Sequence, residues 1–551
     1  MASNYFDKAS LVMIPDAPLE GKVLSVKPED RSGDFTFTRG SNLAATRVDA
    51  NGLIEKGREN LLLQSNQFDT TWSAVSGTIT SGQSGYDGSN DAWLFERTAA
   101  GGSMRQSVSL SGVQTTSVYA KGGSLNWMAF VSGGSLTAYF DLQNGALGTV
   151  SAAVIEAKIE SVGNGWYRCS ITQDVSLTEV RIYPALGDFD LSANGTIYIQ
   201  DAQLEKGLVA TDYIETGAST SQAGILEDLP RLDYTDSSCP ALLLEPLRTN
   251  LVSNSELLDT LNQTNADISI SPDLSPEGVY NANRAERVTG SQVGQSFSIT
   301  SGVDYTNSIY AKSVSGSGKI QIVNMQGEST EFNITSEWQR YSLTDESTST
   351  TGRCYVRLWA IGDIVDFYGL QCEQGSYATS YIPTYGSSVS RVAETCTDAG
   401  TSATFNSTEG VLYFEGSAIS GNDSTFKRIA IGTSDDNFVN NINIRYNTDG
   451  VSVTYQYRVG SVYQADLTIP INQTDVNKIA CVWKVNRFEI WLNGVKAAED
   501  TSGSVISANT LDTMYYGKTT TFSEPLYGKT NQVLVFPTAL SDEELAALTT
   551  I

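Results

Sequence analysis

Histidine is absent from all 551 residues of the chain, and this absence excludes several classes of enzyme. A Ser-His-Asp triad, a Cys-His dyad and a His-ligated zinc or iron site all require an imidazole. Chemistry at neutral pH would therefore use carboxylates, tyrosine, lysine or cysteine, as in a glycosidase with two carboxylates.

Basic residues are scarce, because 35 Lys and Arg stand against 62 Asp and Glu and give a formal net charge of −27. A protein that binds duplex nucleic acid needs a basic surface to displace phosphate counterions. We therefore expect this chain to repel DNA, RNA and anionic bilayers. It also lacks a long apolar stretch and a basic, then apolar, N-terminal region, so we expect no membrane insertion, no signal peptide and folding in the cytoplasm.

The six cysteines form neither a C-x-x-C pair nor the spacing of a zinc site. Cys169 and Cys481 lie in strand-like runs, where a free cysteine behaves as a small buried apolar residue. The scattered spacing favours buried free thiols over a framework of disulfides.

One β-rich unit is present twice along the chain. RENLLLQSN from Arg58 returns as RTNLVSNSE from Arg248, SVYAK returns as SIYAK, and WYRCSI returns as WQRYSL. A Gln-x-Glu triplet and a Tyr-Ile-x-Thr segment then follow in both copies. Five matches in one order predict an internal duplication.

Each copy consists of short runs rich in β-branched and aromatic residues, many of which alternate at period two. Gly, Asn, Asp and Ser separate these runs at the spacing typical of sandwiches. We therefore predict an all-β fold with tandem antiparallel jelly-roll sandwiches at residues 58–215 and 248–391, joined by a connector at 216–247.

A third β unit of different pattern is predicted for residues 392–551. Asn493-Gly494 lies between two alternating runs, which is the typical signal of a hairpin with a type I′ turn. Ser541 and Glu544 form a capping box, so a short helix should end the chain. This hairpin and helix resemble those of a concanavalin A-like, laminin-G-like domain, which implies a two-sheet jelly roll with a curved face often used to bind glycans.

Another set of strings carries a second resemblance, namely ATRVDANGLIE, NLLLQSNQFDTTW, PRLDY, CPALLLEPLRTNL and DAQLEKG. They are similar to a pattern found in tailed-phage virion proteins, where it occurs in tail fibres, head fibres and adhesins around carbohydrate-binding-module-like sandwiches. The resemblance implies a structural protein located in the virion, whose residues 1–57 anchor it to other virion proteins. It also implies a homotrimer that attaches to host-surface polysaccharide, and it does not distinguish head from tail.

Three functions fit these observations. The first is a fibre that adheres to host glycans by multivalent binding, which needs no strong single site. The second is a purely architectural capsid decoration or head fibre. The third is a polysaccharide depolymerase, which needs two carboxylates across one cleft. No second carboxylate accompanies Glu205 or Glu373 of the Gln-x-Glu triplets in both copies, so we expect a structural role for them and no enzymatic activity.

Aromatic residues are the candidates for sugar contact, because their rings stack on the C–H faces of sugars. Those at matched positions in the two copies, such as Trp166 and Trp338, are expected in the core. The unmatched ones are the predicted glycan-binding residues Trp72, Trp93, Trp127 and Trp359. In the C-terminal unit Tyr455, Tyr457 and Tyr463 alternate along a strand pair, a pattern that fits either a concave binding face or the sandwich interior.

No cofactor is predicted, and calcium is the one ion that the sequence leaves open. The Asp-rich loops DGSND, GDFD and SDDN offer oxygen ligands. None of them has the spacing of a known calcium loop, so the metal-ligating residues are unknown.

Overall fold

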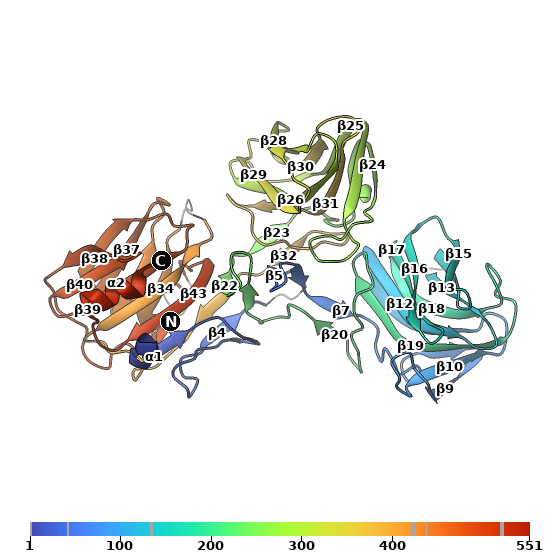
Figure 1. Ribbon diagram of the computed structural model, residues 1–551, viewed down its shortest axis with the longest axis horizontal. Coiled ribbons are helices and arrows are strands. Elements are labelled where there is room, and N and C mark those ends of the chain that lie inside the picture. The colour runs from blue at the N-terminus through green and yellow to red at the C-terminus, as the bar shows by residue number, and fades with distance from the viewer. Residues whose placement is uncertain (1–2, 41–42, 133–135, 421–424, 436–437, 518–522) are drawn as a thin grey trace.

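The structure is a computed structural model that describes residues 3–40, 43–132, 136–420, 425–435, 438–517 and 523–551. Strands make up 52% of the chain and helices 3%, which confirms the predicted all-β class. The strands form three antiparallel sandwiches that lie side by side, named here sandwich 1, sandwich 2 and the C-terminal sandwich (Figure 1). Neither α-helix of the described residues is long and apolar enough to span a membrane.

Sandwich 1 consists of two six-stranded sheets. Its inner sheet, on the side of sandwich 2, has the order β16-β17-β12-β19-β10-β9, and its outer sheet has the order β15-β14-β13-β18-β11-β8 (Figure 1). Phe95, Val118 and Phe130 are buried between the sheets, as the period-two alternation predicts. The strands span Ser73–Val75 (β8), Gly77–Gln83 (β9), Ala92–Arg97 (β10), Ser103–Leu110 (β11), Val113–Gly122 (β12), Trp127–Ser132 (β13), Leu136–Asp141 (β14), Ala146–Val150 (β15), Val154–Gly163 (β16), Trp166–Asp174 (β17), Leu177–Ala185 (β18) and Gly195–Lys206 (β19).

Sandwich 2 repeats this arrangement with one difference. The long strand β25 pairs with β31 through its first residues and with β30 through its last, so it passes from one layer to the other. The strands span Asn262–Ile270 (β24), Asn283–Ser298 (β25), Asp304–Ser315 (β26), Lys319–Val323 (β27), Ser329–Asn333 (β28), Gln339–Glu346 (β29), Thr351–Leu358 (β30) and Ile364–Gln374 (β31), and a 3-10 turn spans Leu258–Thr260.

One asparagine makes the same four hydrogen bonds in each copy. The Asn250 amide donates to the Leu370 and Ile382 carbonyls, and its oxygen accepts from two backbone N–H groups. Asn60 repeats this pattern in sandwich 1. Both side chains are buried, so each asparagine holds the start of its sandwich against the last strand.

Replacing Asn250 with alanine should lower the free energy of unfolding by about 3 kcal/mol, because buried backbone groups would lose their partners. Calorimetry of the whole chain measures this. The matched control is Thr249→Ala, whose hydroxyl bonds only the exposed Ser390 hydroxyl and which should cost less than about 0.5 kcal/mol. Equal losses for the two variants would contradict the role of Asn250.

The C-terminal sandwich contains the predicted hairpin and helix. Asn493 and Gly494 both have positive φ, of 50° and 89°, as a type I′ turn requires. Ser541 and Glu544 form the capping box at the start of α2, Asp542–Thr549. The strands span Gly410–Ala418 (β34), Lys427–Gly432 (β35), Asn441–Tyr446 (β36), Ser452–Val459 (β37), Val462–Pro470 (β38), Asn477–Lys484 (β39), Arg487–Leu492 (β40), Val495–Asp500 (β41), Thr513–Tyr515 (β42) and Gly528–Phe536 (β43).

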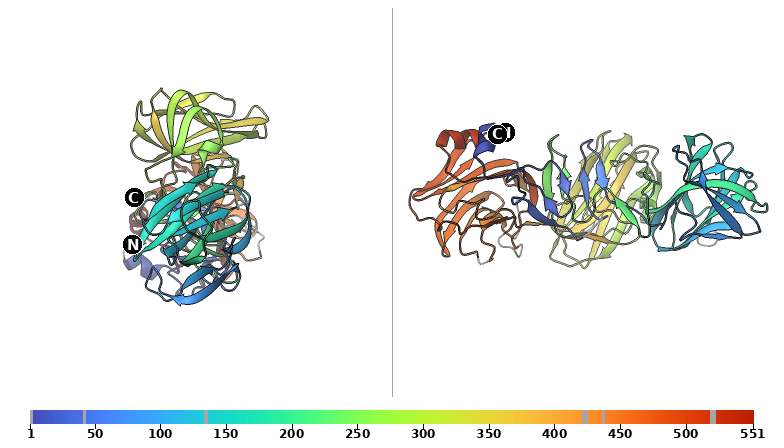
Figure 2. Two further views of the ribbon diagram at one scale, coloured as in Figure 1. Left: turned by 90° about the vertical axis from the view of Figure 1, so that its right-hand side faces the viewer. Right: turned by 90° about the horizontal axis from the view of Figure 1, so that it is seen from below.

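Segments from elsewhere in the chain complete the C-terminal sandwich. β1 (Leu11–Met13) and β22 (Ala241–Leu244) both pair with β43, and β21 (Arg231–Asp233) pairs with β22. The helix α1 (Ser3–Lys8) lies beside α2, with the Tyr5 hydroxyl donating to the Glu544 carbonyl, so the two termini are neighbours (Figure 2).

The predicted division at residues 57, 215, 247 and 391 does not anticipate these pairings, and the anchoring role of residues 1–57 stays a prediction. The remaining short strands span Pro18–Leu19 (β2), Lys22–Val23 (β3), Phe35–Thr38 (β4), Thr46–Val48 (β5), Ile54–Lys56 (β6), Arg58–Asn60 (β7), Ser221–Ala223 (β20), Arg248–Asn250 (β23), Val389–Arg391 (β32) and Thr395–Thr397 (β33).

A buried ionic network joins the segments at the centre of the molecule. It consists of Arg39, Arg231, Glu245, Arg391 and Glu394, whose side chains are all essentially inaccessible to solvent. Arg231 contacts both carboxylates, with its Nε 2.7 Å from Glu394 and its Nη1 2.8 Å from Glu245. The network therefore connects the N-terminal segment, the middle connector and the residues after sandwich 2.

Candidate functional site

Trp72 and Trp93 lie in the core of sandwich 1. Both rings pack against Phe68. The centroids of the Trp72 and Trp93 rings lie 5.0 and 6.3 Å from the centroid of the Phe68 ring. Each indole N–H donates to a backbone carbonyl of the same sandwich. Their contacts are those of core residues, and little ring surface is left for a sugar.

Tyr455 and Tyr457 are fully buried between the sheets of the C-terminal sandwich. Their hydroxyls donate to the Val482 and Ser407 carbonyls. These two tyrosines therefore lie in the sandwich interior, one of the two positions that the alternation predicts. No ring face of either residue is left for a glycan. Tyr463 differs, because 45% of it is exposed.

Trp359 lies at the surface of sandwich 2, where 40% of it is exposed. The Lys319 ammonium lies 5.3 Å from the centre of its ring. Glycan contact by Trp359 and Tyr463 stays a prediction.

Trp127 is the predicted residue that lies among other aromatic residues on the outer face of a sheet. It is half-buried on the solvent side of β13, two residues from Ala129. Tyr139 on β14 and Tyr183 on β18 flank Ala129 in register, and therefore point to the same side of the outer sheet. Burial and the nearby Asp188 carboxylate raise the pKa of Tyr139, so its hydroxyl keeps its proton.

Phe189 completes this surface. It is not among the glycan-binding residues predicted from the sequence. It lies in the loop after β18 with a φ of 57°, 74% of it is exposed, and its ring centroid is 5.8 Å from that of Tyr139. The Asp188 carboxylate accepts from both the backbone and the hydroxyl of Thr149, which fixes the loop. Trp127, Tyr139, Tyr183 and Phe189 are called the aromatic face below. Tyr139 and Tyr183 are buried beneath it, so its accessible rings are those of Phe189 and the half-buried Trp127. Phe189 lies inside the string GDFD, whose aspartates suggested calcium rather than an aromatic contact.

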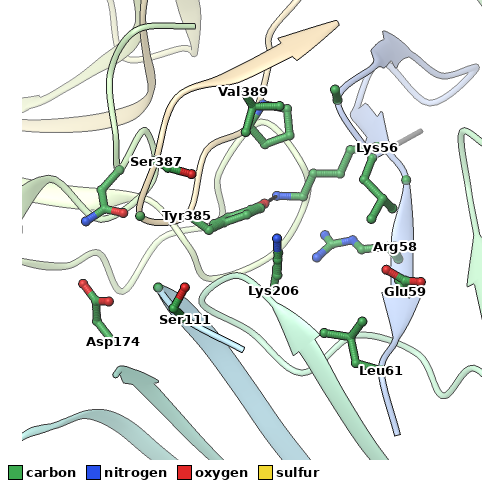
Figure 3. Close-up of a pocket in the computed structure, with 17 residues that line it drawn as sticks. Lys56, Arg58, Glu59, Leu61, Ser111, Asp174, Lys206, Tyr385, Ser387 and Val389 are labelled. Carbon is green, nitrogen blue, oxygen red and sulfur yellow. Dashed lines mark hydrogen bonds between the residues drawn. The ribbon is translucent and has the colours of Figure 1, made fainter. Parts of the chain in front are cut away.

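A cavity of about 520 Å³ lies between sandwich 1, sandwich 2 and residues 43–61, which are called the first connector (Figure 3). We call it the junction cavity. Gly112 of sandwich 1 approaches the Tyr385 carbonyl so closely that a Cβ there would lie 1.7 Å from the oxygen, and its φ is +88°. This position therefore requires glycine.

Lys56 is the most deeply buried charge at the junction cavity. Its ammonium lies 2.6 Å from Glu256 and also contacts Glu277 and the Tyr385 hydroxyl. Burial alone would raise the pKa of Glu277, but Lys56 and then Arg58 outweigh it and hold that pKa below its ordinary value. Lys56 therefore ties the first connector to sandwich 2.

The buried glutamates of the described chain near this cavity are engaged. Glu256 and Glu277 are both buried and bound to Lys56, so neither is placed to protonate a glycosidic oxygen. Glu205 and Glu373 each accept from the backbone and hydroxyl of one threonine, the structural role expected for the Gln-x-Glu triplets.

Metal ligands were not assigned from the sequence, and the described residues contain no group of three or more acidic or cysteine side chains arranged to hold an ion. In the loop DGSND, Asp87 and Asp91 both accept from the Gln200 amide. The loop SDDN lies partly outside the described residues. All six cysteines are free, and only Cys239 is exposed. Calcium binding stays a prediction.

The fold is that of a multidomain all-β protein built of antiparallel sandwiches. The family model of the concanavalin A-like lectin/glucanases superfamily matches residues 417–546. A comparison with curated proteins finds no match.

Solved structures of carbohydrate-binding modules are among the neighbours. The CBM40 of the Ruminococcus gnavus IT-sialidase is 19% identical, covers 26% of this chain and 83% of its own, and has a TM-score of 0.22. The same module has been solved with sialyllactose. The tandem CBM22 domain of Paenibacillus barcinonensis Xyn10C is 10% identical, covers 64% of this chain and 100% of its own, and has a TM-score of 0.20.

Proposed function

We propose that the protein binds glycans through the aromatic face of sandwich 1, without catalysis, as a structural component of a tailed-phage virion. Its partner would be a host-surface polysaccharide, and its form a homotrimer on a tail or head fibre. Residues 1–57 would contact other virion proteins. The connector strings that resemble phage proteins support the virion assignment, and the sandwiches support glycan binding.

The observation that carries the binding proposal is the position of Phe189. An aromatic ring that is 74% exposed gains little from burial, and a positive φ is unfavourable for a residue with a Cβ. Neither feature stabilises the fold. Both place an exposed ring beside Tyr139, where it can stack on a sugar as exposed aromatic residues do in ligand sites.

Weak binding at one face is sufficient for attachment when several copies act together. Three tethered chains raise the effective concentration of each face near the cell surface. A strong single site, and a catalytic one, are therefore not needed for an adhesin.

Replacing Phe189 or Trp127 with alanine should weaken glycan binding about tenfold or more, which corresponds to about 1.4 kcal/mol of lost stacking. The glycan is first identified by an array probed with the whole chain, and the affinities are then measured by calorimetry. Tyr280→Ala is the matched control, because Tyr280 is 49% exposed but lies in sandwich 2, away from the aromatic face. Phe189→Ala removes a ring that is 74% exposed and keeps a Cβ at the same φ, so it should change the stability of the fold little.

Wild-type affinity in both variants would contradict the proposal. Absence of glycan binding, together with loss of trimer or virion assembly in Phe189→Ala, would instead support the architectural alternative, in which this apolar surface contacts another subunit. Release of reducing ends from host polysaccharide would favour a depolymerase.

A further inference from the structure

The junction cavity has features of a built binding site that the aromatic face does not explain. Its volume of about 520 Å³ lies within the range of small-molecule sites. Its walls include the first connector at Lys56–Leu61, the strand ends Asp174 and Lys206 of sandwich 1, Asn254 at the start of sandwich 2, and the segment Pro383–Val389 after it. It therefore exists only when the repeats are docked.

Three cationic side chains point toward the middle of the cavity, around Tyr385 (Figure 3). Lys56 is neutralised by its two glutamates, but Lys206 has no hydrogen-bond or ion-pair partner among the described residues. Arg58 pairs with Glu277 through Nη2 at 3.2 Å, and its other nitrogens bond no group in the described part of the chain. Donors from Lys206 and Arg58 thus remain available to an anion.

The cavity also contains a buried acceptor without a donor. Asn254 is 7% exposed, and its Oδ1 has no hydrogen-bond partner in the described structure. The orientation of the amide is determined, because the Thr260 hydroxyl donates to the Leu257 carbonyl and so must accept from the Asn254 nitrogen. An unpaired buried oxygen favours a ligand that brings a hydroxyl group.

The second copy contains a similar hollow, which keeps an arginine, Arg248, in the place of Arg58 but has no lysine. A cavity of about 540 Å³ follows the start of sandwich 2, lined by Arg248, Thr249 and Gln374. Gln374 comes directly after the Gln-x-Glu triplet of the second copy, as Lys206 does in the first. Thr249 likewise takes the place of Glu59. The fold therefore makes the hollow in both copies, but it does not require a lysine at this position.

We propose that the junction cavity binds the carboxylate-bearing unit of an acidic saccharide, such as a uronic or sialic acid. The carboxylate lies between Lys206 and Arg58, which supply charge-assisted hydrogen bonds. A sugar hydroxyl donates to Asn254 Oδ1, and another donates to the Asp174 carboxylate at the far end. Inorganic phosphate satisfies the cations but brings few donors for these two acceptors, so the saccharide is favoured.

The test uses the whole chain with D-glucuronate, D-glucose and inorganic phosphate, measured by calorimetry at low salt. Glucuronate should bind, glucose and phosphate should bind at least about tenfold more weakly, and added salt should weaken the glucuronate affinity. Lys206→Gln, which installs the residue of the second copy, should reduce that affinity about tenfold.

Lys484→Gln in the C-terminal sandwich removes the same charge from an exposed lysine and should leave the affinity unchanged. The proposal is overturned if glucuronate does not bind, if Lys206→Gln binds like wild type, or if phosphate binds as tightly as glucuronate. It is independent of the aromatic face, because that face lies on the other sheet of sandwich 1. If glucuronate does not bind but glycan binding still depends on Phe189, the cavity site alone is rejected. If glucuronate binds but glycan binding does not depend on Phe189, only the aromatic face is rejected.

Discussion

Replacing Arg231 with methionine should lower the free energy of unfolding by about 3–5 kcal/mol, the range found when one partner of a buried ion pair is removed. Arg231 bonds Glu245 and Glu394, and none of the three side chains contacts solvent. In the variant both carboxylates stay in the interior with less positive charge around them. Because the network joins three segments, amide exchange should rise in the N-terminal segment and the middle connector together.

The chain provides a matched control in its first connector. TRVD and IEKGRENL of the first connector correspond to PRLD and LEPLRTNL of the middle connector, so Arg47 and Glu55 take the places of Arg231 and Glu245. Arg47 and Glu55 pair at 2.7 Å with 15% and 32% of their side chains exposed. Arg47→Met should therefore cost less than about 1 kcal/mol. Calorimetry of the two variants compares equivalent Arg-Glu pairs, one buried and one more exposed. Equal losses of unfolding free energy would contradict the importance of burial for the Arg231 pair.

Acid provides a second measure of the Arg231 variant. Burial by itself would raise the pKa of Glu245, but Arg391 and Arg231 hold it at about 2. A carboxylate with a depressed pKa stabilises the fold above its unfolded value of about 4, and this contribution is lost as the pH falls toward 2. Wild type should lose stability steeply over this range, and Arg231→Met should lose less.

Replacing Lys56 with methionine should also cost about 3–5 kcal/mol and should loosen the first connector from sandwich 2. The variant leaves Glu256 and Glu277 close together without the ammonium that both now contact. Burial, which Lys56 now opposes, would then raise the pKa of Glu277 above the unfolded value of about 4.

The pH dependence distinguishes this effect from simple loss of packing. Carboxylates whose pKa values are raised in the folded state destabilise it at neutral pH, and they do so less as the pH falls toward those values. The stability difference between wild type and Lys56→Met should therefore shrink from pH 8 to pH 5. Lys319→Met, which breaks the exposed pair with Glu331, is the control and should cost less than about 1 kcal/mol at each pH. A difference for Lys56→Met that does not change with pH would contradict the account.

Local patterns predicted the local parts of the fold. Alternation at period two identified the strands, because it records which side chains face the core. Asn493-Gly494 predicted its hairpin and Ser541 with Glu544 predicted the last helix, because both signals act over a few neighbouring residues. The order of shared strings likewise identified two copies, and the Asn60 and Asn250 contacts repeat in both.

Contacts between distant segments were not predictable in this way. β1 pairs with β43 across more than 500 residues, and a three-residue strand carries no mark of its partner. Arg231 and Arg47 lie in similar strings, yet only the tertiary structure buries one and exposes the other. The same applies to the glycan candidates, since alternation placed Tyr455 and Tyr457 on one face but could not decide between inside and outside. Phe189 was missed because its neighbours in space, Trp127 and Tyr139, come from other strands.

The pairing of β1 and β22 with β43 also affects how function should be tested. A fragment of residues 396–551 would lack strands that complete its own sheet, and would expose the edge they cover. Glycan binding by the C-terminal sandwich is therefore best measured in the whole chain, with variants that change one surface at a time.

The central claim is that the protein holds a glycan on the aromatic face and leaves it intact. The most direct test is an experimental structure of the whole chain with the oligosaccharide that it retains from an array. The account predicts an uncleaved sugar whose ring stacks on Phe189 beside Trp127. A sugar bound only at another surface, or a cleaved product between two carboxylates, would contradict it.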